Sequence, residues 1–179
     1  MLPININELL EKNRIESNRI EYKQGWNPTA IYHTICAFAN DLENLGGGYI
    51  VVGVEEENGI AKRPVMGVPT EQLDKIQQQM VGFNNLFAPY YLPRVSVEEV
   101  DGKNVVVIWA PVGINRPFIE TDEDRSYFLM YIPVHEGCGN VVTLKEQKED
   151  LHKDYPKITQ RLPKDCPKIA QRLHKAHWN

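Results

Sequence analysis

The sequence predicts an α+β (mixed α/β) domain in which a mostly antiparallel or mixed sheet carries about three packed helices, followed by a basic C-terminal tail. Three segments have apolar residues at helical spacing, and the other apolar residues fall in short β-branched and aromatic runs. The two kinds of segment are interspersed along the chain. With 179 residues, 42% of them apolar and 25% charged, the chain is long enough for one sizeable core.

A short helix and a strand are expected first. Residues 2–13 carry apolar side chains at helical spacing, and Asn5 or Asn7 is available as the N-cap. Residues 19–23 then have the pattern of a strand.

A longer helix and a buried strand follow. Pro28 suits the first turn of a helix, and apolar spacing extends that helix over residues 28–44. We interpret Gly46, Gly47 and Gly48 as its stop. A phosphate-binding role for these glycines is disfavoured, because they follow a helix C-terminus, whose carbonyls repel anions. The β-branched run at 49–54 is typical of a strand buried on both faces, which we expect at the centre of the sheet.

The second half of the domain is expected to be richer in strands. Residues 70–80 form a surface helix with one apolar face. Asp101-Gly102 favours a tight turn, which predicts an antiparallel hairpin between strands 95–100 and 104–109. Two further strands are expected at 117–119 and 127–132, joined by an acidic loop.

Charge divides the chain into an acidic body and a basic tail. Residues 1–144 carry a net charge of −8 and residues 145–179 one of +4. We therefore expect a core domain over 1–143 and a helical or weakly ordered tail over 144–179. The tail contains an 11-residue repeat, in which residues 154–164 are followed by the similar residues 165–175. The body lacks the strongly basic charge that would indicate non-specific phosphate binding.

Composition also predicts the compartment. No apolar run approaches the roughly 18 to 20 residues needed to cross a bilayer, and the first residues lack the order of a signal peptide, so we expect no membrane association. The three cysteines, Cys36, Cys138 and Cys166, are far apart and form no Cys-x-x-Cys pair. We interpret them as reduced thiols in the cytoplasm.

Several motifs occur in a distinctive order. They are Glu16-Ser17, Ile20-Glu21-Tyr22-Lys23, Thr34-Ile35-Cys36-Ala37-Phe38-Ala39-Asn40, the run GGGYIVVGVEE at 46–56, Arg116-Pro117-Phe118, and the aromatic segment 127–132. With this order and spacing, the chain resembles the Schlafen-type AlbA domain, formerly called the divergent AAA domain, over residues 14–135.

The resemblance implies a mixed α/β nucleic-acid-binding domain, of the kind found at the N-terminus of many bacterial proteins regarded as DNA-binding transcriptional regulators. In the eukaryotic Schlafen branch it implies an endoribonuclease. The catalytic group there comprises the acidic positions of a Glu-x-x-x-x-Glu-x-Lys motif, matched here by Glu16, Glu21 and Lys23, and an acid after the Gly-Val strand, matched by Glu55 or Glu56.

The chain departs from this family pattern at three points. Residues 41–45 lengthen the helix or its exit loop, and Ile132-Pro133 stands where the family has Ile-Arg, which removes an arginine expected to face phosphate. Glutamate replaces the usual aspartate after Val54, which adds one methylene to the acid.

The residues themselves allow two interpretations of the acidic motif. Glu21 and Lys23 project from the same face of a strand, and Glu55 and Glu56 leave the end of the central strand. If the two strands are neighbours, these side chains and Glu16 converge; Glu16, Glu21 and Glu55 could then hold Mg²⁺ or Mn²⁺ while Lys23 offsets phosphate charge. Otherwise they form a solvated ion pair and an exposed acidic turn.

Two functions follow from these observations. The first is a nucleic-acid-binding module, DNA or RNA, whose phosphate contacts are basic residues flanking the motif: Arg14, Arg19, Lys23, Arg116 and Arg125. It needs no cofactor. The second is a metal-dependent endoribonuclease that uses the carboxylates and Lys23. A third function is also open: an interaction domain that only assembles with other chains, with the exposed edges of the hairpin mediating a homodimer.

Overall fold

The computed structural model describes residues 4–11, 19–41, 45–116, 118–121, 125–133 and 139–147. Its helices are α1 (Ile6–Glu11), α2 (Pro28–Asn40) and α3 (Thr70–Asn84). Its strands are β1 (Ile20–Lys23), β2 (Gly48–Val52), β3 (Glu56–Glu57), β4 (Ile60–Ala61), β5 (Phe87–Ala88), β6 (Arg94–Val100), β7 (Lys103–Ala110), β8 (Ile119–Thr121), β9 (Arg125–Pro133) and β10 (Gly139–Gln147).

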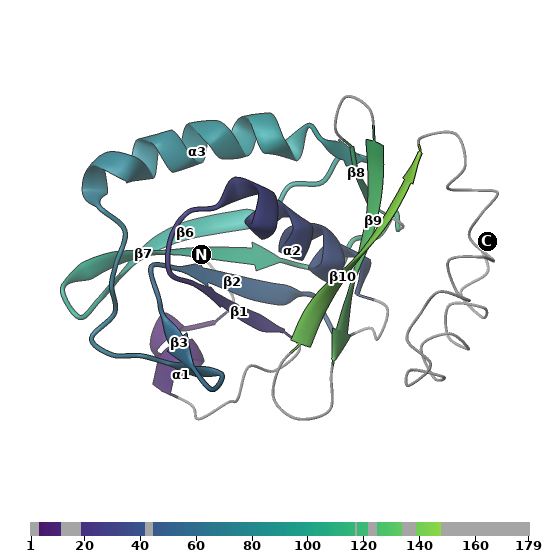
Figure 1. The fold of residues 1–179 in the computed structure, drawn as a ribbon. Helices are drawn as coiled ribbons and strands as arrows, with labels where there is room; N and C mark the ends of the chain where they lie inside the picture. Colours follow the sequence, from purple (N-terminus) through teal and green to yellow (C-terminus); the bar gives the residue numbers. More distant parts are fainter. Residues whose placement is uncertain are drawn as a thin grey trace.

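The strands form two four-stranded sheets and a short hairpin. The first sheet has the order β1-β2-β7-β6 and is mixed, because β1 runs parallel to β2 while the other pairs are antiparallel. The second sheet, β10-β9-β8-β5, is antiparallel, and β3 pairs with β4. Helix α2 packs against both four-stranded sheets, and α3 runs along the top of the first in Figure 1. The predicted α+β class is confirmed.

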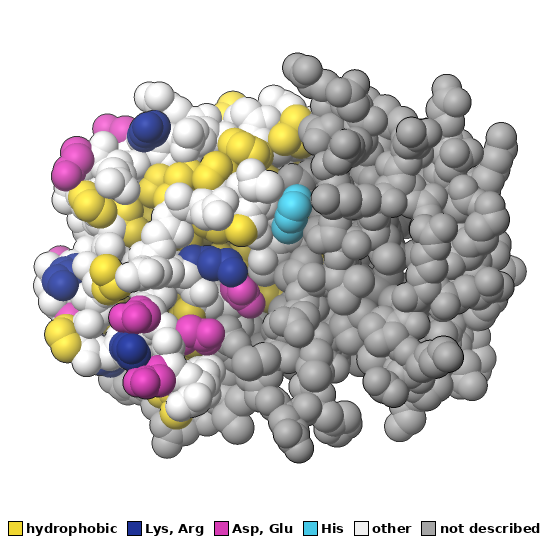
Figure 2. Space-filling model, viewed as in Figure 1, with side chains coloured by type: hydrophobic (Ala, Val, Ile, Leu, Met, Phe, Trp, Pro, Cys, Tyr) yellow, Lys and Arg dark blue, Asp and Glu magenta, His cyan; other side chains and the backbone are white. Residues whose placement is uncertain are grey.

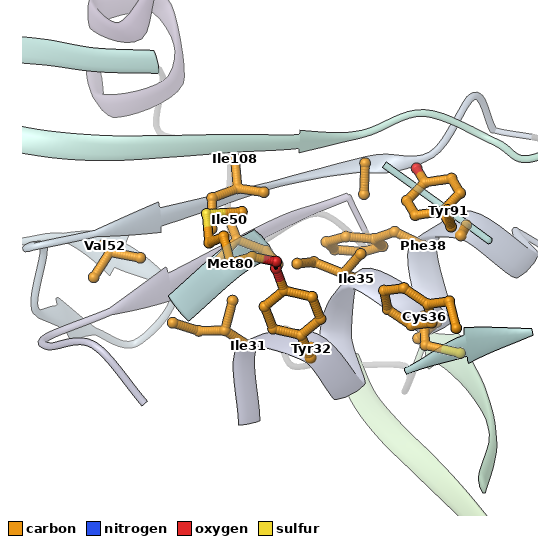
Figure 3. Packing of buried hydrophobic residues seen from close by; sticks show 14 of the residues in the cluster. Ile31, Tyr32, Ile35, Cys36, Phe38, Ile50, Val52, Met80, Tyr91 and Ile108 are labelled. Carbon is orange, nitrogen blue, oxygen red and sulfur yellow. The ribbon is translucent and has the colours of Figure 1, made fainter. Parts of the chain in front are cut away.

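Two apolar layers cover opposite faces of the first sheet. One joins α2 and α3 to β2 and β7, and in Figure 3 the strand residues Ile50 and Ile108 face Ile35 of α2. The other packs Leu9 of α1 against the opposite face, which includes Val51. The side chains of β2 are therefore buried on both sides, as predicted for the central strand.

Local signals predicted most of the element types. Asn5 caps α1, since its side-chain oxygen accepts the Asn7 N–H at 2.9 Å. The hairpin β6-β7 is confirmed, and both of its turn residues have the positive φ that this tight turn requires, 53° at Asp101 and 72° at Gly102.

Several boundaries were wrong. Helix α2 ends at Asn40 instead of residue 44: Asp41 leaves the helical conformation with a φ of 27°, and its carboxylate accepts the N–H groups of Leu45, Gly46 and Gly47. Helix α3 continues to Asn84, four residues beyond the prediction, since Met80 and Asn84 pack against Tyr32 of α2.

The C-terminal part contains one strand that the sequence patterns did not predict. Strand β10 pairs with β9 along its whole length, from Gly139 to Gln147. The predicted strand at 117–119 is displaced to β8, which pairs with β9 as expected. The boundary at residue 143 stays a prediction, because residues 148–179, including the 11-residue repeat, lie outside the described residues. No helix among the described residues is long and apolar enough to span a membrane.

Candidate functional site

The parallel pairing of β1 and β2 brings part of the acidic motif to one edge of the first sheet. Lys23 is in register with Val52, and the backbone N–H groups of Gly53 and Val54 donate to the Lys23 carbonyl at 2.8 and 3.2 Å. Glu55 follows directly. The two strands are neighbours, which was the condition for the motif to converge, and Lys23 and Glu55 leave the same end of the pair.

Glu21 and Lys23 form a close ion pair on β1. The Lys23 ammonium donates to Glu21 Oε1 at 2.6 Å, and the Glu21 and Lys23 side chains are only 16% and 27% exposed. Ile20 and Tyr22 are buried and alternate with them, so the pair lies on the sheet face that α2 covers, beside Ile50 and Val52. Because the pair is partly buried, solvent and salt screen the attraction between its charges less than they do in an ordinary surface salt bridge.

Lys62 is a further cation at this edge that sequence reasoning missed. Its ammonium lies 3.4 Å from Glu55 Oε1 and 3.8 Å from Glu57 Oε2. The β3-β4 hairpin brings these residues together, and the Lys62 N–H also donates to the Glu55 carbonyl at 2.7 Å. All three side chains are more than 40% exposed, so the pairing is weak and open to competing ligands. Glu56 is exposed on β3.

The carboxylates suit a hard cation by their chemistry, but the described residues supply only part of a site. Within residues 4–11, 19–41 and 45–116, and the described parts beyond, no three Asp, Glu, His or Cys side chains are grouped to hold a metal ion. Glu16, the third predicted ligand, lies outside the described residues. Metal binding by Glu16, Glu21 and Glu55 therefore stays a prediction.

The predicted phosphate-binding residues divide between two ends of the sheet. Arg19 and Arg116 both bind the connection between α2 and β2: Arg19 Nε donates to the Gly47 carbonyl at 2.9 Å. Arg116 Nη1 donates to the carbonyls of Asn40 and Asp41 at 3.1 and 2.8 Å. Lys23 lies at the opposite end of β1.

Two members of that set cannot be placed. Arg14 and the side chain of Arg125 lie outside the described residues.

The backbone N–H groups just before β2 bind the carboxylate of Asp41, a residue of the same chain. The N–H groups of Leu45, Gly46 and Gly47 donate to the Asp41 carboxylate at 3.0, 2.7 and 3.0 Å. Gly46 and Gly47 have φ values of 94° and 78°, which glycine adopts without strain. These amides are thus occupied by an internal carboxylate, which agrees with the expectation that the loop is no phosphate cradle.

Aromatic residues differ in how far they reach the surface. Phe87 and Tyr91 belong to the buried core, and Trp26 donates to Gln79 Oε1 at 2.7 Å. Tyr49 and Trp109 lie on neighbouring strands with their rings stacked, 6.3 Å between centroids and 16° between planes. Partial burial raises the pKa of Tyr49, and the charge of Arg19 opposes that rise.

Charge on the face that carries α2 and α3 is mixed. Figure 2 shows acidic and basic side chains next to one another over α1 and β3, and a band of apolar side chains below α3. A groove of about 370 Å³ lies between α2 and α3, and its apolar lining includes Trp26, Pro28 and Ile76. Among the described residues, this face carries no extended patch of one sign.

These features define an α+β domain with motifs at both ends of a parallel strand pair. The chain belongs to the Schlafen AlbA_2 family, whose pattern matches residues 16–131. No curated protein matches it.

Two solved structures are similar. One is the N-terminal domain of a Nitrosomonas europaea protein described as related to the ATP-dependent DNA helicase RecG, with 25% identity and a TM-score of 0.50 over 66% of this chain and 78% of that one. The other is a Corynebacterium diphtheriae protein with 17% identity and a TM-score of 0.49, matched over 87% of this chain and 27% of that one. The chain thus spans about a quarter of the second protein.

Proposed function

We propose that this chain is a nucleic-acid-binding module that works in the bacterial cytoplasm as the N-terminal domain of a DNA-binding transcriptional regulator. The observation that carries the proposal is the convergence of Arg19 and Arg116 on the Asp41–Gly47 connection, at one end of the first sheet. The likeness to the N-terminal domain of a RecG-related protein, at 25% identity, supports the same class of ligand.

Arginine suits this task because its planar guanidinium stays charged and can bind phosphate through two parallel hydrogen bonds. Backbone carbonyls of the loop hold both side chains in place, which lowers the entropy lost when a phosphate binds. Lys23, at the other end of β1, extends the contact only if the nucleic acid follows the strand. Arg14 and Arg125 complete the predicted set.

The test is fluorescence anisotropy with labelled duplex DNA and single-stranded RNA over a series of salt concentrations. Binding should weaken steeply with salt, and Arg19→Gln should reduce the slope of log K against log salt by about 1, as expected for one lost phosphate contact. Lys75→Gln, on the exposed face of α3, removes the same charge elsewhere and should leave affinity within about twofold. Absence of binding to either nucleic acid at low salt contradicts the proposal.

A second candidate function is metal-dependent cleavage of structured RNA. The observation that favours it is the partly buried Glu21–Lys23 pair on β1, at the end of the strand pair from which Glu55 follows β2. Glu16, Glu21 and Glu55 or Glu56 would hold Mg²⁺ or Mn²⁺, which would supply an activated water. Lys23 would pair with the scissile phosphate, and Glu21 holds its ammonium in position for that contact.

Incubation with transfer RNA and either metal tests the nuclease. Glu21→Gln and Lys23→Ala should each abolish cleavage, whereas Glu71→Gln, an exposed carboxylate on α3, should not affect it. Cleavage that survives Glu21→Gln, or none by the unmodified chain with either metal, removes this function and leaves the binding module intact.

A homodimer through β6 is the third element of the proposal. Strand β6 is at the edge of the first sheet, and its Val95 and Val97 side chains are 36% and 37% exposed. An apolar edge strand of this kind can pair with a second copy. Sedimentation at several concentrations should show a dimer that Val97→Lys dissociates; a monomer at every concentration refutes it.

A further inference from the structure

A row of stacked planar groups crosses the face of the first sheet opposite α2 and α3. Register places Tyr49 of β2 beside Trp109 of β7, and Trp109 beside Arg94 of β6. The rings of Tyr49 and Trp109 stack with 16° between their planes, and Arg94 Cζ lies over the indole at 5.3 Å from its centroid. We call Tyr49, Trp109 and Arg94 the stacking row.

The stacking row extends outward from the apolar layer that contains α1, against which Tyr49 packs. Further along the same face, Val51, Val105 and Val107 are at most 1% exposed and pack in the layer that contains α1. Tyr49 and Trp109 are only partly buried, and Arg94 is exposed. The outer side of the row is therefore a flat guanidinium that solvent and ligands can reach.

Positive charge lies at both ends of the stacking row. Arg94 lies at one end of the row, on the edge strand β6. At the other end, Arg19 precedes Ile20, the β1 residue in register with Tyr49, and the Arg19 carbonyl accepts the Tyr49 N–H at 2.7 Å. The carboxylate of β6 on this face, Glu98, is four residues from Arg94 and accepts the Ser96 hydroxyl at 2.7 Å. Arg94 thus stacks on the row itself, whereas the Arg19 guanidinium is held near the other end by its hydrogen bond to the Gly47 carbonyl.

We propose that the stacking row binds unpaired bases of a single-stranded nucleic acid. A base would extend the stack on the outer face of the Arg94 guanidinium, or take its place on the Trp109 indole. Arg94 would then pair with a nearby phosphate, and Arg19, three strands away in the sheet, with a phosphate further along the strand. Every base has a flat π face, so such a site binds single strands with little dependence on base identity. This inference rests on the proposed function and specifies its substrate class.

A duplex cannot use this site, because its bases are already stacked and paired. An apolar protein partner would also gain little from the exposed charge of Arg94 and the half-buried charge of Arg19. Charge complementarity therefore favours a polyanion with exposed planar groups over either alternative.

The experiment compares the affinities of four labelled ligands for the full chain: oligothymidine, oligouridine, an abasic oligonucleotide of the same length and charge, and a duplex. Trp109→Leu should weaken binding of the two base-bearing single strands by about tenfold or more and change binding of the abasic strand and duplex by less than about twofold. Trp109→Phe keeps a ring and should retain most of the affinity. Trp26→Leu, in the groove between α2 and α3, is the matched control and should have no effect.

Arg94 provides a second test that does not disturb the core, because its side chain is exposed. Arg94→Lys keeps the charge but removes the planar group, so it should weaken binding of base-bearing strands and spare the abasic one. The inference is overturned if folded Trp109→Leu and Arg94→Lys bind oligothymidine and oligouridine as tightly as the unmodified chain. If duplex binding persists in that case, the proposed function stands; if the unmodified chain binds none of the ligands, both fail.

Discussion

Asn40 holds the backbone of Phe118 through both ends of its side-chain amide. Asn40 Oδ1 accepts the Phe118 N–H at 2.7 Å, and Nδ2 donates to the Phe118 carbonyl at 3.0 Å. Asn40 is 1% exposed, so water cannot replace either bond. The family motif ending in Asn40 and the motif Arg116-Pro117-Phe118 thus hold each other, and part of the sequence resemblance reflects structural rather than ligand contacts.

Replacement of Asn40 should destabilise the chain strongly. Asn40→Leu leaves the Phe118 N–H buried without this acceptor, and we expect a loss of about 2 to 3 kcal/mol in the free energy of unfolding. Urea denaturation followed by circular dichroism measures it as a lower midpoint with an unchanged m-value. Asn104→Ala removes an exposed bond to Thr70 Oγ1 and should cost less than about 1 kcal/mol. Equal losses from the two variants would contradict this role for Asn40.

Asp41 should control the order of the loop before β2. Asp41→Ala removes the acceptor of three backbone N–H groups, and we expect a loss of about 1 to 2 kcal/mol, similar to that of a lost helix cap. In Asp41→Ala, hydrogen exchange at Leu45, Gly46 and Gly47 should be faster than in the unmodified chain, while exchange at β7 amides stays the same. Asp41→Asn keeps one acceptor oxygen and should show a smaller effect. Unchanged protection in Asp41→Ala would show that the carboxylate does not order the loop.

Two glycines should respond oppositely to alanine. Gly47 has a φ of 78°, and a Cβ there would collide with the Ala110 carbonyl, so Gly47→Ala should cost more than about 2 kcal/mol or prevent folding. Gly82 lies in α3 with open space around its Cβ position, and Gly82→Ala should stabilise by about 0.5 to 1 kcal/mol. Thermal melting distinguishes the two; a neutral Gly47→Ala would be inconsistent with this backbone geometry.

Acid should weaken the contact between the hairpin turn and the segment before α3. Hydrogen bonds from the Arg63 side chain and from the Val65 N–H hold the pKa of Asp101 below its ordinary value of 3.8. The folded pKa is lowered, so this contribution to stability is complete above pH 3.8 and is lost as pH falls through the folded value. Asp101→Asn tolerates the same positive φ and should remove that part of the acid dependence, measured by urea unfolding between pH 2 and 6. An unchanged profile would exclude this coupling.

The sequence by itself determined the elements whose signals are local. Three such signals depend only on residues close in sequence: the β-branched run of β2, the Asp-Gly turn of the β6-β7 hairpin and the amphipathic spacing of α3. Each predicts the burial or the turn geometry of its own segment. The motif order predicted the family as well, and the family match over residues 16–131 confirms it.

Only the tertiary structure decided which side chains meet. The parallel pairing of β1 and β2 brings Lys23 and Glu55 to one edge and leaves Arg19 and Arg116 at the other end, so the predicted cationic set is divided. Cross-strand register also brings Arg94 over Trp109, two residues that sequence reasoning did not connect. Such neighbours depend on strand order and register, which are set by burial across the whole sheet and which no local pattern encodes.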